Sequence, residues 1–150
     1  MDGGLARFQA RMKAIPEAVR LGVQPALLQS GGEVAAAIRG LAPVDTGALK
    51  ESVTVTGPGQ ATPPYPQPGG SMVVPENAVA VTEGNSDVRY AHLVEYGTGG
   101  RMNTGGSQAT FNPGTVAQPH FWPGFRMTRD RAQRRIKAAI SKAVKDNWGK

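Results

Sequence analysis

The sequence predicts an α+β fold, in which a small antiparallel sheet is packed by a long N-terminal helix and a C-terminal amphipathic helix. Apolar side chains recur at helical spacing in residues 5–41 and 124–148, whereas residues 52–56 and 78–82 alternate as strands do. Gly- and Pro-rich stretches separate these segments. With 150 residues the chain fits one domain, residues 1–150, and a domain of this size buries about 68–70% of its unfolded surface.

The N-terminal helix is expected to be kinked or broken. Apolar residues follow one another at steps of three or four through residues 5–41, which predicts one buried stripe. Pro25 and the pair Gly31–Gly32 interrupt this pattern, because proline removes a helical hydrogen bond and glycine weakens a helix interior. Gly40 and Pro43 mark the expected end of the helix.

A turn is expected directly after this helix, at Asp45, Thr46 and Gly47. The side chains of Asp45 and Thr46 can hydrogen-bond nearby backbone groups, and Gly47 can adopt a positive φ. One carboxylate and one hydroxyl make only a weak metal or phosphate site. We therefore interpret the segment as a turn between helix and strand.

The middle of the chain alternates short strands with long loops. Residues 71–74 are a further short strand candidate beside the two strands named above. Residues 57–70 are rich in proline, which cannot join a sheet ladder, and residues 99–116 are rich in glycine and polar side chains. We expect both to be long loops that reach away from the body, with Tyr65 docking on a neighbouring subunit.

The densest apolar and aromatic run in the middle of the chain is residues 90–98. Tyr90, Leu93 and Val94 stand at positions i, i+3 and i+4, which places them on one side of a short helix that packs on the core. Gly97 suits the position after the last helical turn, where a left-handed conformation costs glycine little. A strand is the alternative, because tyrosine and valine also favour sheets.

Glu95 is the carboxylate within this apolar run, and it needs a polar partner. Such a residue caps backbone N–H groups or pairs with an arginine, for which Arg126 and Arg129 are candidates. A divalent metal held by Glu95 with His92 and His120 is an alternative, as is a catalytic carboxylate with a raised pKa. No nucleophile motif, phosphate-binding loop or dinucleotide fingerprint is present, and the chain has no cysteine. We therefore expect no enzyme, no cofactor and no metal.

Two prolines, Pro119 and Pro123, bracket a group of aromatic residues before the last helix. Because proline fixes its own φ, the side chains of Phe121, Trp122 and Phe125 are presented rigidly. We expect them to lie against the core beside Tyr90 and Tyr96.

The C-terminal helix separates an apolar face from a cationic one. Isoleucine, valine, tryptophan and alanine side chains share one side of residues 124–148. The opposite side gathers Arg131, Arg134, Arg135, Lys142 and Lys145. Such a face is solvated or meets an acidic neighbour, and direct binding to the phosphates of DNA is the alternative.

Charge is unevenly spread along the chain. Residues 1–50 carry a net charge of +2, residues 51–100 of −4 and residues 101–150 of +8, within a total of +6. The acidic middle can therefore face the basic end of a second copy. The expected acidic surface consists of Glu51, Glu76, Glu83, Asp87 and Glu95.

Neither a membrane span nor a secretory signal is expected. No apolar run approaches the roughly 20 residues that span a bilayer. The N-terminus lacks the basic-then-apolar layout of a signal peptide. We expect a soluble protein with no membrane partner.

Three separated stretches resemble the small tail-component proteins of tailed bacteriophages, which are tail-completion or head–tail joining proteins of long-tailed phages and related gene-transfer particles. They are residues 42–49 (APVDTGAL) after a helix, residues 90–98 (YAHLVEYGT), and residues 117–123 (AQPHFWP) before a helix. Their order and spacing cover nearly the whole chain. His120 stands between proline and phenylalanine in the third stretch, where family members often have the two adjacent.

The resemblance implies an α+β fold and a structural role in the virion. Subunits of such proteins form a ring at the neck or head-proximal end of the tail, here expected to be a hexamer. The implied partners are neighbouring neck and tail proteins and, non-specifically, DNA in the channel, with assembly in the host cytoplasm. Loop and helix geometry is assigned to Asp45, Thr46, Gly47, Tyr90, Glu95, Gly97, Thr98, Pro119, Phe121 and Pro123. Subunit or partner contact is assigned to Tyr65, Arg101, Phe111, Arg131, Arg134, Arg135, Lys142 and Lys145.

Overall fold

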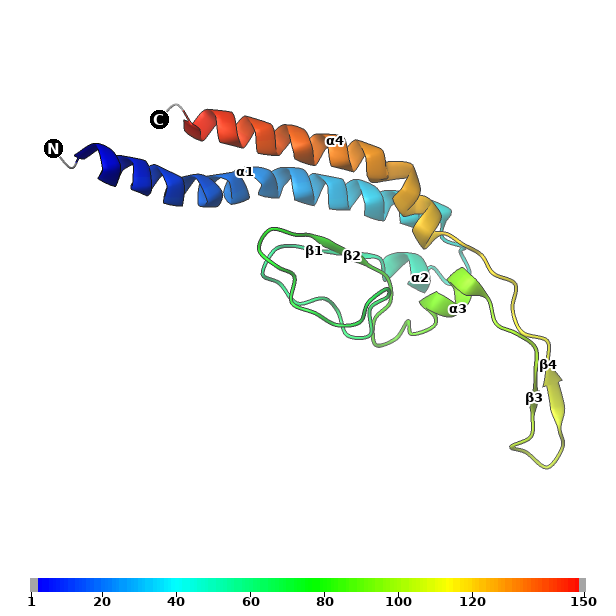
Figure 1. Cartoon of the computed structure of the whole chain (residues 1–150). Coiled ribbons are helices and arrows are strands. Elements are labelled where there is room, and N and C mark those ends of the chain that lie inside the picture. Colours follow the sequence, from blue (N-terminus) through cyan, green and yellow to red (C-terminus); the bar gives the residue numbers. More distant parts are fainter. Residues whose placement is uncertain (1–2, 149–150) are drawn as a thin grey trace.

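The computed structural model describes residues 3–148, apart from the side chains of residues 3–5 and 11–15, and shows an α+β fold (Figure 1). Its elements are α1 (Gly3–Leu41), α2 (Ala48–Glu51), β1 (Thr54–Thr56), β2 (Ala80–Thr82), α3 (Ala91–Tyr96), β3 (Arg101–Asn103), β4 (Thr110–Asn112) and α4 (Phe121–Trp148). The strands form two separate antiparallel pairs, β1–β2 and β3–β4, where one small sheet was expected.

The long helix α1 is the middle layer of the molecule. α4 lies antiparallel along one side of α1, and the β1–β2 pair lies against another side (Figure 1). The β3–β4 hairpin projects at one end of the elongated molecule, and the start of α1 and the end of α4 lie together at the other end.

α1 is one continuous helix of 39 residues, so of the expected kink or break at Pro25 and Gly31–Gly32 the break does not occur. Pro25 removes the hydrogen bond to the carbonyl of Leu21, but both residues are exposed, so water can satisfy that carbonyl. Gly31 is a packing position, since a Cβ built there would lie 2.8 Å from a methyl group of Val79. Packing against α4 and the sheet keeps the helix continuous where local preference alone would not.

The main core lies where α1, the β1–β2 pair and the start of α4 meet. It consists of Val34, Ala35, Ile38, Val53 and Phe121, with Val55, Val81 and Trp122 packed against it. A second cluster joins α2 to α3 through Leu49, Val88 and Ala91. The C-terminal part of α1 and the N-terminal part of α4 therefore pack in the same core as the β1–β2 pair.

The Pro-rich segment of residues 57–70 folds back on the body, so the expectation that it reaches away is wrong. The N–H of Thr62 donates to the carbonyl of Met72 at 2.9 Å, and the N–H groups of Gln67 and Glu83 donate to each other's carbonyls at 2.7 and 2.9 Å. Residues 71–74 form no strand but contribute one isolated bridge, between Ala61 and Val73. Prolines exclude a continuous ladder here, yet single bridges between them remain available.

α4 approaches α1 most closely at Gly124. A Cβ built on Gly124 would lie 2.8 Å from the backbone nitrogen of Ile38 and 2.9 Å from its Cα. The buried positions farther along α4 are also small, at Thr128 and Ala143, whereas the larger Ile140 and Val144 stay partly exposed. The helices are thus held together by close approach of small side chains rather than by the expected stripe of large apolar ones.

We predict that Gly124→Ala destabilises the protein by about 1–3 kcal/mol, because the added methyl group overpacks a contact with backbone atoms that cannot move freely. Urea denaturation measures the change in the free energy of unfolding. Gly32→Ala is the matched control, because a Cβ at Gly32 meets nothing within 4 Å. The control should stabilise α1 by about 0.5–1 kcal/mol. Equal effects of the two substitutions would contradict the close crossing.

Candidate functional site

The three sequence stretches that resemble phage tail proteins meet in space. The N–H of Gln118 donates to the carbonyl of Val94 at 2.8 Å, which joins the third stretch to the second. A hollow of about 340 Å³ is lined by Pro43, Val44, Asp45, Thr46, Gly47 and Leu49 of the first stretch together with Tyr90, Val94 and Gln118. Segments that lie far apart in the chain therefore form one continuous surface.

Glu95 caps the N-terminus of α4. Its carboxylate accepts the backbone N–H groups of His120 at 2.7 Å, Phe121 at 2.9 Å and Trp122 at 3.2 Å. These are among the N–H groups that a helix start leaves without a partner, and the helix dipole favours an anion there. The capping role expected from the sequence is confirmed. Among the described residues, the structure shows no ion pair between Glu95 and either arginine named as an alternative.

His120 is fully buried between two carboxylates. Its Nε2 lies 2.6 Å from Oε1 of Glu83, and its Nδ1 lies 2.8 Å from the carbonyl of Gln118 and 3.3 Å from Oε2 of Glu95. The carbonyl of Gln118 can only accept, so Nδ1 donates, and Nε2 donates as well when Glu83 is ionised. In that state His120 is a charged imidazolium held between Glu83 and Glu95.

The pKa values of this buried cluster follow from competing effects. Burial by itself lowers the pKa of His120, but the hydrogen bonds to Glu83 and to the carbonyl of Gln118, with the charges of both carboxylates, raise it above its ordinary value. Burial by itself raises the pKa of Glu95, but three backbone N–H donors and His120 bring it below its ordinary value. The folded state thus favours the charged forms of both groups.

The structure does not support the metal site considered as an alternative. Across the described part of the chain, no group of three or more histidine, aspartate or glutamate side chains is arranged to hold an ion. His92 is exposed on α3, and both ring nitrogens of His120 already have partners. The expected acidic surface is also wrong at Glu83 and Glu95, which are buried around His120.

α3 confirms the predicted short helix but turns a different face inward. Its buried residues are Ala91 and Glu95, whereas Tyr90 and Leu93 are each 41% exposed. Gly97 ends the helix with φ 72°, and a Cβ there would lie 2.6 Å from the carbonyl oxygen of Thr115. The expectation that Tyr90 and Leu93 pack on the core is wrong, because the buried partners of Glu95 lie on the opposite side.

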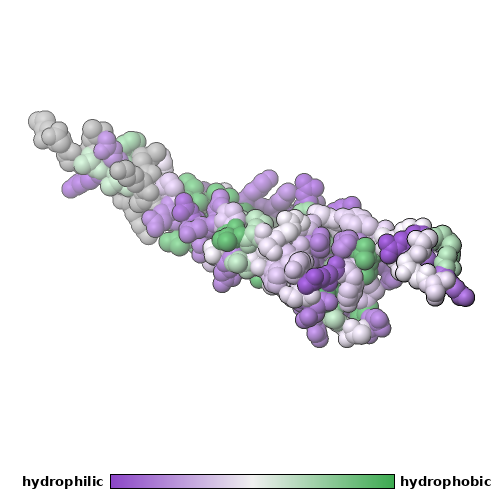
Figure 2. Space-filling model, turned by 90° about the horizontal axis from the view of Figure 1, so that it is seen from below, coloured by the Kyte–Doolittle hydropathy of each residue, from purple (hydrophilic) through white to green (hydrophobic). Residues whose placement is uncertain are grey.

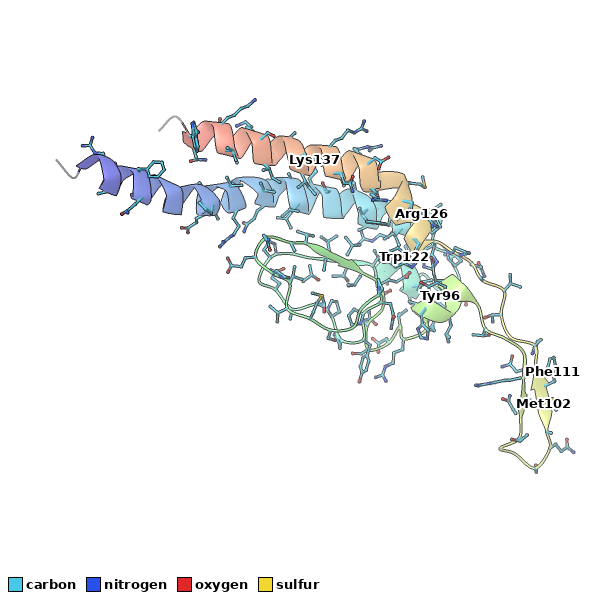
Figure 3. All side chains as sticks on the ribbon, in the orientation of Figure 1. Tyr96, Met102, Phe111, Trp122, Arg126 and Lys137 are labelled. Carbon is cyan, nitrogen blue, oxygen red and sulfur yellow. The ribbon has the colours of Figure 1, made fainter. Side chains whose placement is uncertain are left out.

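The aromatic residues before and within α4 follow the prediction in part, because Trp122 lies beside Tyr96 whereas Phe125 and Tyr90 are exposed. The indole N–H of Trp122 donates to the hydroxyl of Tyr96 at 2.7 Å (Figure 3). Phe121 is buried and meets Trp122 edge to face, with ring centres 5.4 Å apart. Pro123 lies in the first turn of α4, where the missing N–H costs nothing.

Residues 99–116 form a β-hairpin rather than a loop without secondary structure. Arg101 pairs with Asn112, and Met102 stands opposite Phe111. At the base, the N–H of Thr115 donates to the carbonyl of Thr98 at 3.1 Å and to its hydroxyl at 2.9 Å. The hairpin projects from the body, with Met102 56% and Phe111 65% exposed (Figure 3).

A second hollow, of about 630 Å³, lies at the base of the hairpin. It is lined by Tyr90, Leu93, Val94, Thr98, Gly99, Arg101, Asn112, Thr115, Val116 and Gln118. Apolar side chains of α3 and Val116 of the second leg, with polar side chains from both legs, therefore line a concave surface large enough for side chains of another molecule.

The five cations assigned to one face of α4 do not form a single free surface. Arg135 turns toward α1, where it binds Ser30 and Glu33. Arg131 lies 3.7 Å from Glu33, and Lys142 pairs with Asp146 at 2.7 Å within α4. Arg134 and Lys145 are exposed.

The remaining assigned residues lie at the surface. Asp45 is exposed, the hydroxyl of Thr46 accepts the N–H of Ala48 at 3.4 Å, and Gly47 has φ 89° as the turn requires. Pro119 is exposed beside the buried His120. Tyr65 is exposed at 54%, with the guanidinium of Arg89 4.0 Å above its ring.

Glu83 is the residue of this site that the sequence did not single out. It follows β2 directly and reads like a strand-end charge at the surface, and no local spacing links it to His120, 37 residues away. Its role becomes visible only through the fold.

None of the helices within residues 3–148 is long and apolar enough to cross a membrane.

We predict that Glu95→Gln destabilises the protein by about 3–5 kcal/mol. An amide cannot accept all three N–H groups, and it removes a negative charge that compensates the buried positive charge of His120. Chemical denaturation near pH 6 measures the loss. Glu51→Gln is the control, since Glu51 is exposed, and should change the free energy of unfolding by no more than about 0.5 kcal/mol. A loss below about 1 kcal/mol in Glu95→Gln would refute the capping role.

We predict maximal stability between the two ordinary pKa values, 4.5 for glutamate and 6.5 for histidine. The pKa of His120 is raised on folding, so its contribution is complete below pH 6.5 and is lost as the pH rises through the folded-state pKa. The pKa of Glu95 is lowered, so its contribution is complete above pH 4.5 and is lost as the pH falls through the folded-state pKa.

Unfolding measured in a pH series tests this dependence in the protein and in His120→Asn. The substitution should remove most of the decline on the alkaline side and keep the decline on the acidic side. An unchanged alkaline decline in the variant would show that another group causes it.

Residues 6–97 match the protein family described as "Bacteriophage HK97-gp10, putative tail-component". The match runs from α1 to the end of α3 and includes residues 42–49 and residues 90–97 of the second stretch, whereas Thr98 and residues 117–123 lie beyond it. No curated protein and no solved structure matches the chain. Because the match covers more than half of the 150 residues, the chain belongs to this HK97-gp10-like family of bacteriophage tail components.

Proposed function

We propose that this protein is a structural subunit of the neck or the head-proximal end of a phage tail, where copies join into a ring between the head connector and the tail. Membership of a bacteriophage tail-component family supports a structural role. We expect a ring of six copies in the virion, assembled in the host cytoplasm, with neighbouring neck and tail proteins as further partners. No enzyme activity is part of this proposal.

The observation that carries the proposal is the exposed β3–β4 hairpin. Its central cross-strand pair, Met102 and Phe111, is apolar and more than half exposed. An isolated two-stranded hairpin is at best marginally stable in water, and a projecting apolar pair favours association. Figure 2 shows hydrophobic side chains at the surface of both the hairpin end and the helical part of the molecule. We infer that a neighbouring molecule covers the hairpin.

The geometry of one subunit favours contacts between unlike surfaces. The hairpin is a projection, whereas the 630 Å³ hollow at its base is concave and lined by α3. A projection on one copy and a receptive surface on the next make a heterologous contact, which closes into a ring if the rotation between copies is suitable. The hollow beside Asp45 and Tyr90 extends the same surface.

We predict that Met102→Ser combined with Phe111→Ser abolishes assembly and leaves the fold intact, because both side chains lie outside the core. The mass of the purified protein, measured by light scattering alone and after mixing with neck and tail components, reports the oligomer. The unsubstituted protein should form a closed oligomer, alone or on such a template, and the variant should remain monomeric under both conditions.

The matched control is Met72→Ser with Val73→Ser, which removes a similar exposed apolar pair from the body. It should assemble as the unsubstituted protein does. A ring that forms equally well from the hairpin variant would refute the role of the hairpin, and a monomer under all conditions would refute the ring itself.

A further inference from the structure

A cationic stripe runs along the side of α4 that faces away from α1. It consists of Arg126, Arg134, Lys137 and Lys145, all of them exposed and, among the described residues, without an ion pair in the structure. At about 100° per residue these positions fall within roughly one quarter turn of the helix, and they extend over about 28 Å of its length. Figure 3 shows Arg126 and Lys137 on this helix.

A second copy of the chain does not supply the charge that would neutralise this stripe. In the part of the sequence that connects α1 to α4, residues 42–120, the exposed acidic residues are Asp45, Glu51, Glu76 and Asp87. The cationic residues of the same part are Lys50, Arg89 and Arg101. Because Glu83 and Glu95 are buried around His120, the region exposes almost no excess negative charge. The electrostatic partner of the stripe is therefore a different, strongly anionic molecule.

The composition of the stripe favours a phosphate backbone over an acidic protein. Between Met127 and Val144, the positions inside the same quarter turn are Asp130, Arg134, Lys137 and Ser141. Protein interfaces place apolar and aromatic side chains at their centre and are depleted in lysine, whereas here the exposed apolar residues Met127 and Val144 lie at the two ends of the stripe and its centre is polar. Cations spaced along a polar centre are typical of contacts with phosphates, which position nucleic acid without selecting a sequence.

We propose that the outer face of α4 binds the phosphate backbone of nucleic acid through Arg126, Arg134, Lys137 and Lys145, without sequence preference. A stripe of about 28 Å corresponds to about eight phosphates along one strand of a duplex. Arg135 takes no part, because it is bound to Glu33 and Ser30 of α1. This site is separate from the hairpin, so it goes beyond the proposed assembly role.

Titration of a fluorescent short DNA duplex at several salt concentrations tests the site. Four phosphate contacts predict a slope of about −3.6 in log K against log salt, which weakens binding about a hundredfold between roughly 50 and 200 mM salt. Replacement of all four cations by glutamine should abolish binding at the lower salt concentration. Binding that does not depend on salt, or no binding by the unsubstituted protein, would overturn the proposal.

A control of equal charge separates the stripe from the overall positive charge. Substitution of Arg7, Arg20, Lys50 and Arg89 by glutamine removes four exposed or partly exposed cations from other surfaces. This control should weaken binding by no more than a few fold, and an equal loss in both variants would refute a local site. Thermal unfolding and mass measurement of both variants show whether fold and assembly are retained, so loss of DNA binding is distinguished from failure to form a ring. If purified neck proteins, but no duplex, bind in a stripe-dependent way, the face is a protein contact and the proposal is wrong.

Discussion

The contact between the Glu95 carboxylate and the first N–H groups of α4 is the interaction on which the rest of the structure depends. It joins α3 to α4 across 25 to 27 residues of chain, and His120 extends the connection to Glu83 behind β2. The N–H groups at a buried helix start need acceptors, and an anion is the strongest acceptor available there. The imidazolium of His120 compensates the two buried carboxylates, so each member of the cluster requires the others.

This buried cluster also sets the direction of the hairpin. The chain leaves α3 at Gly97 and returns at Gln118, whose N–H is bound to Val94, so both legs of the hairpin start next to the cap. The close approach of Gly97 to Thr115 leaves no room for a side chain between the legs. A rigid base therefore holds a projecting tip, which is what a contact between neighbouring subunits requires.

The hairpin and the outer face of α4 are chemically different surfaces. The hairpin end exposes apolar side chains and concave surfaces, suited to another protein. The outer face of α4 carries unpaired cations, suited to an anionic polymer. Packing through Gly124 and Ala143 brings α4 close to α1, and Ile140 and Val144 of α4 stay partly exposed. The family match ends at residue 97, before both the hairpin and α4.

The sequence by itself indicated helices in residues 5–41 and 124–148, the turn at Gly47, strands at residues 52–56 and 78–82, and a short helix ending at Gly97 with a strand as its alternative. These features follow from local periodicity and from the φ angles that glycine tolerates, which neighbouring residues suffice to encode. It also left capping as one of four roles for Glu95, beside an arginine pair, a metal site and a catalytic carboxylate, and the structure shows the capping contacts.

Only the tertiary structure decided which side chains are buried and which residues they contact. Glu83 joined His120, Arg135 turned to Glu33, the Pro-rich segment folded back, and α1 stayed continuous through Pro25. Each of these outcomes depends on contacts between residues that are distant in the chain. Local spacing carries no information about such contacts. The free energy of burying a charged side chain, or of keeping a proline inside a helix, depends on the segment that packs against that residue.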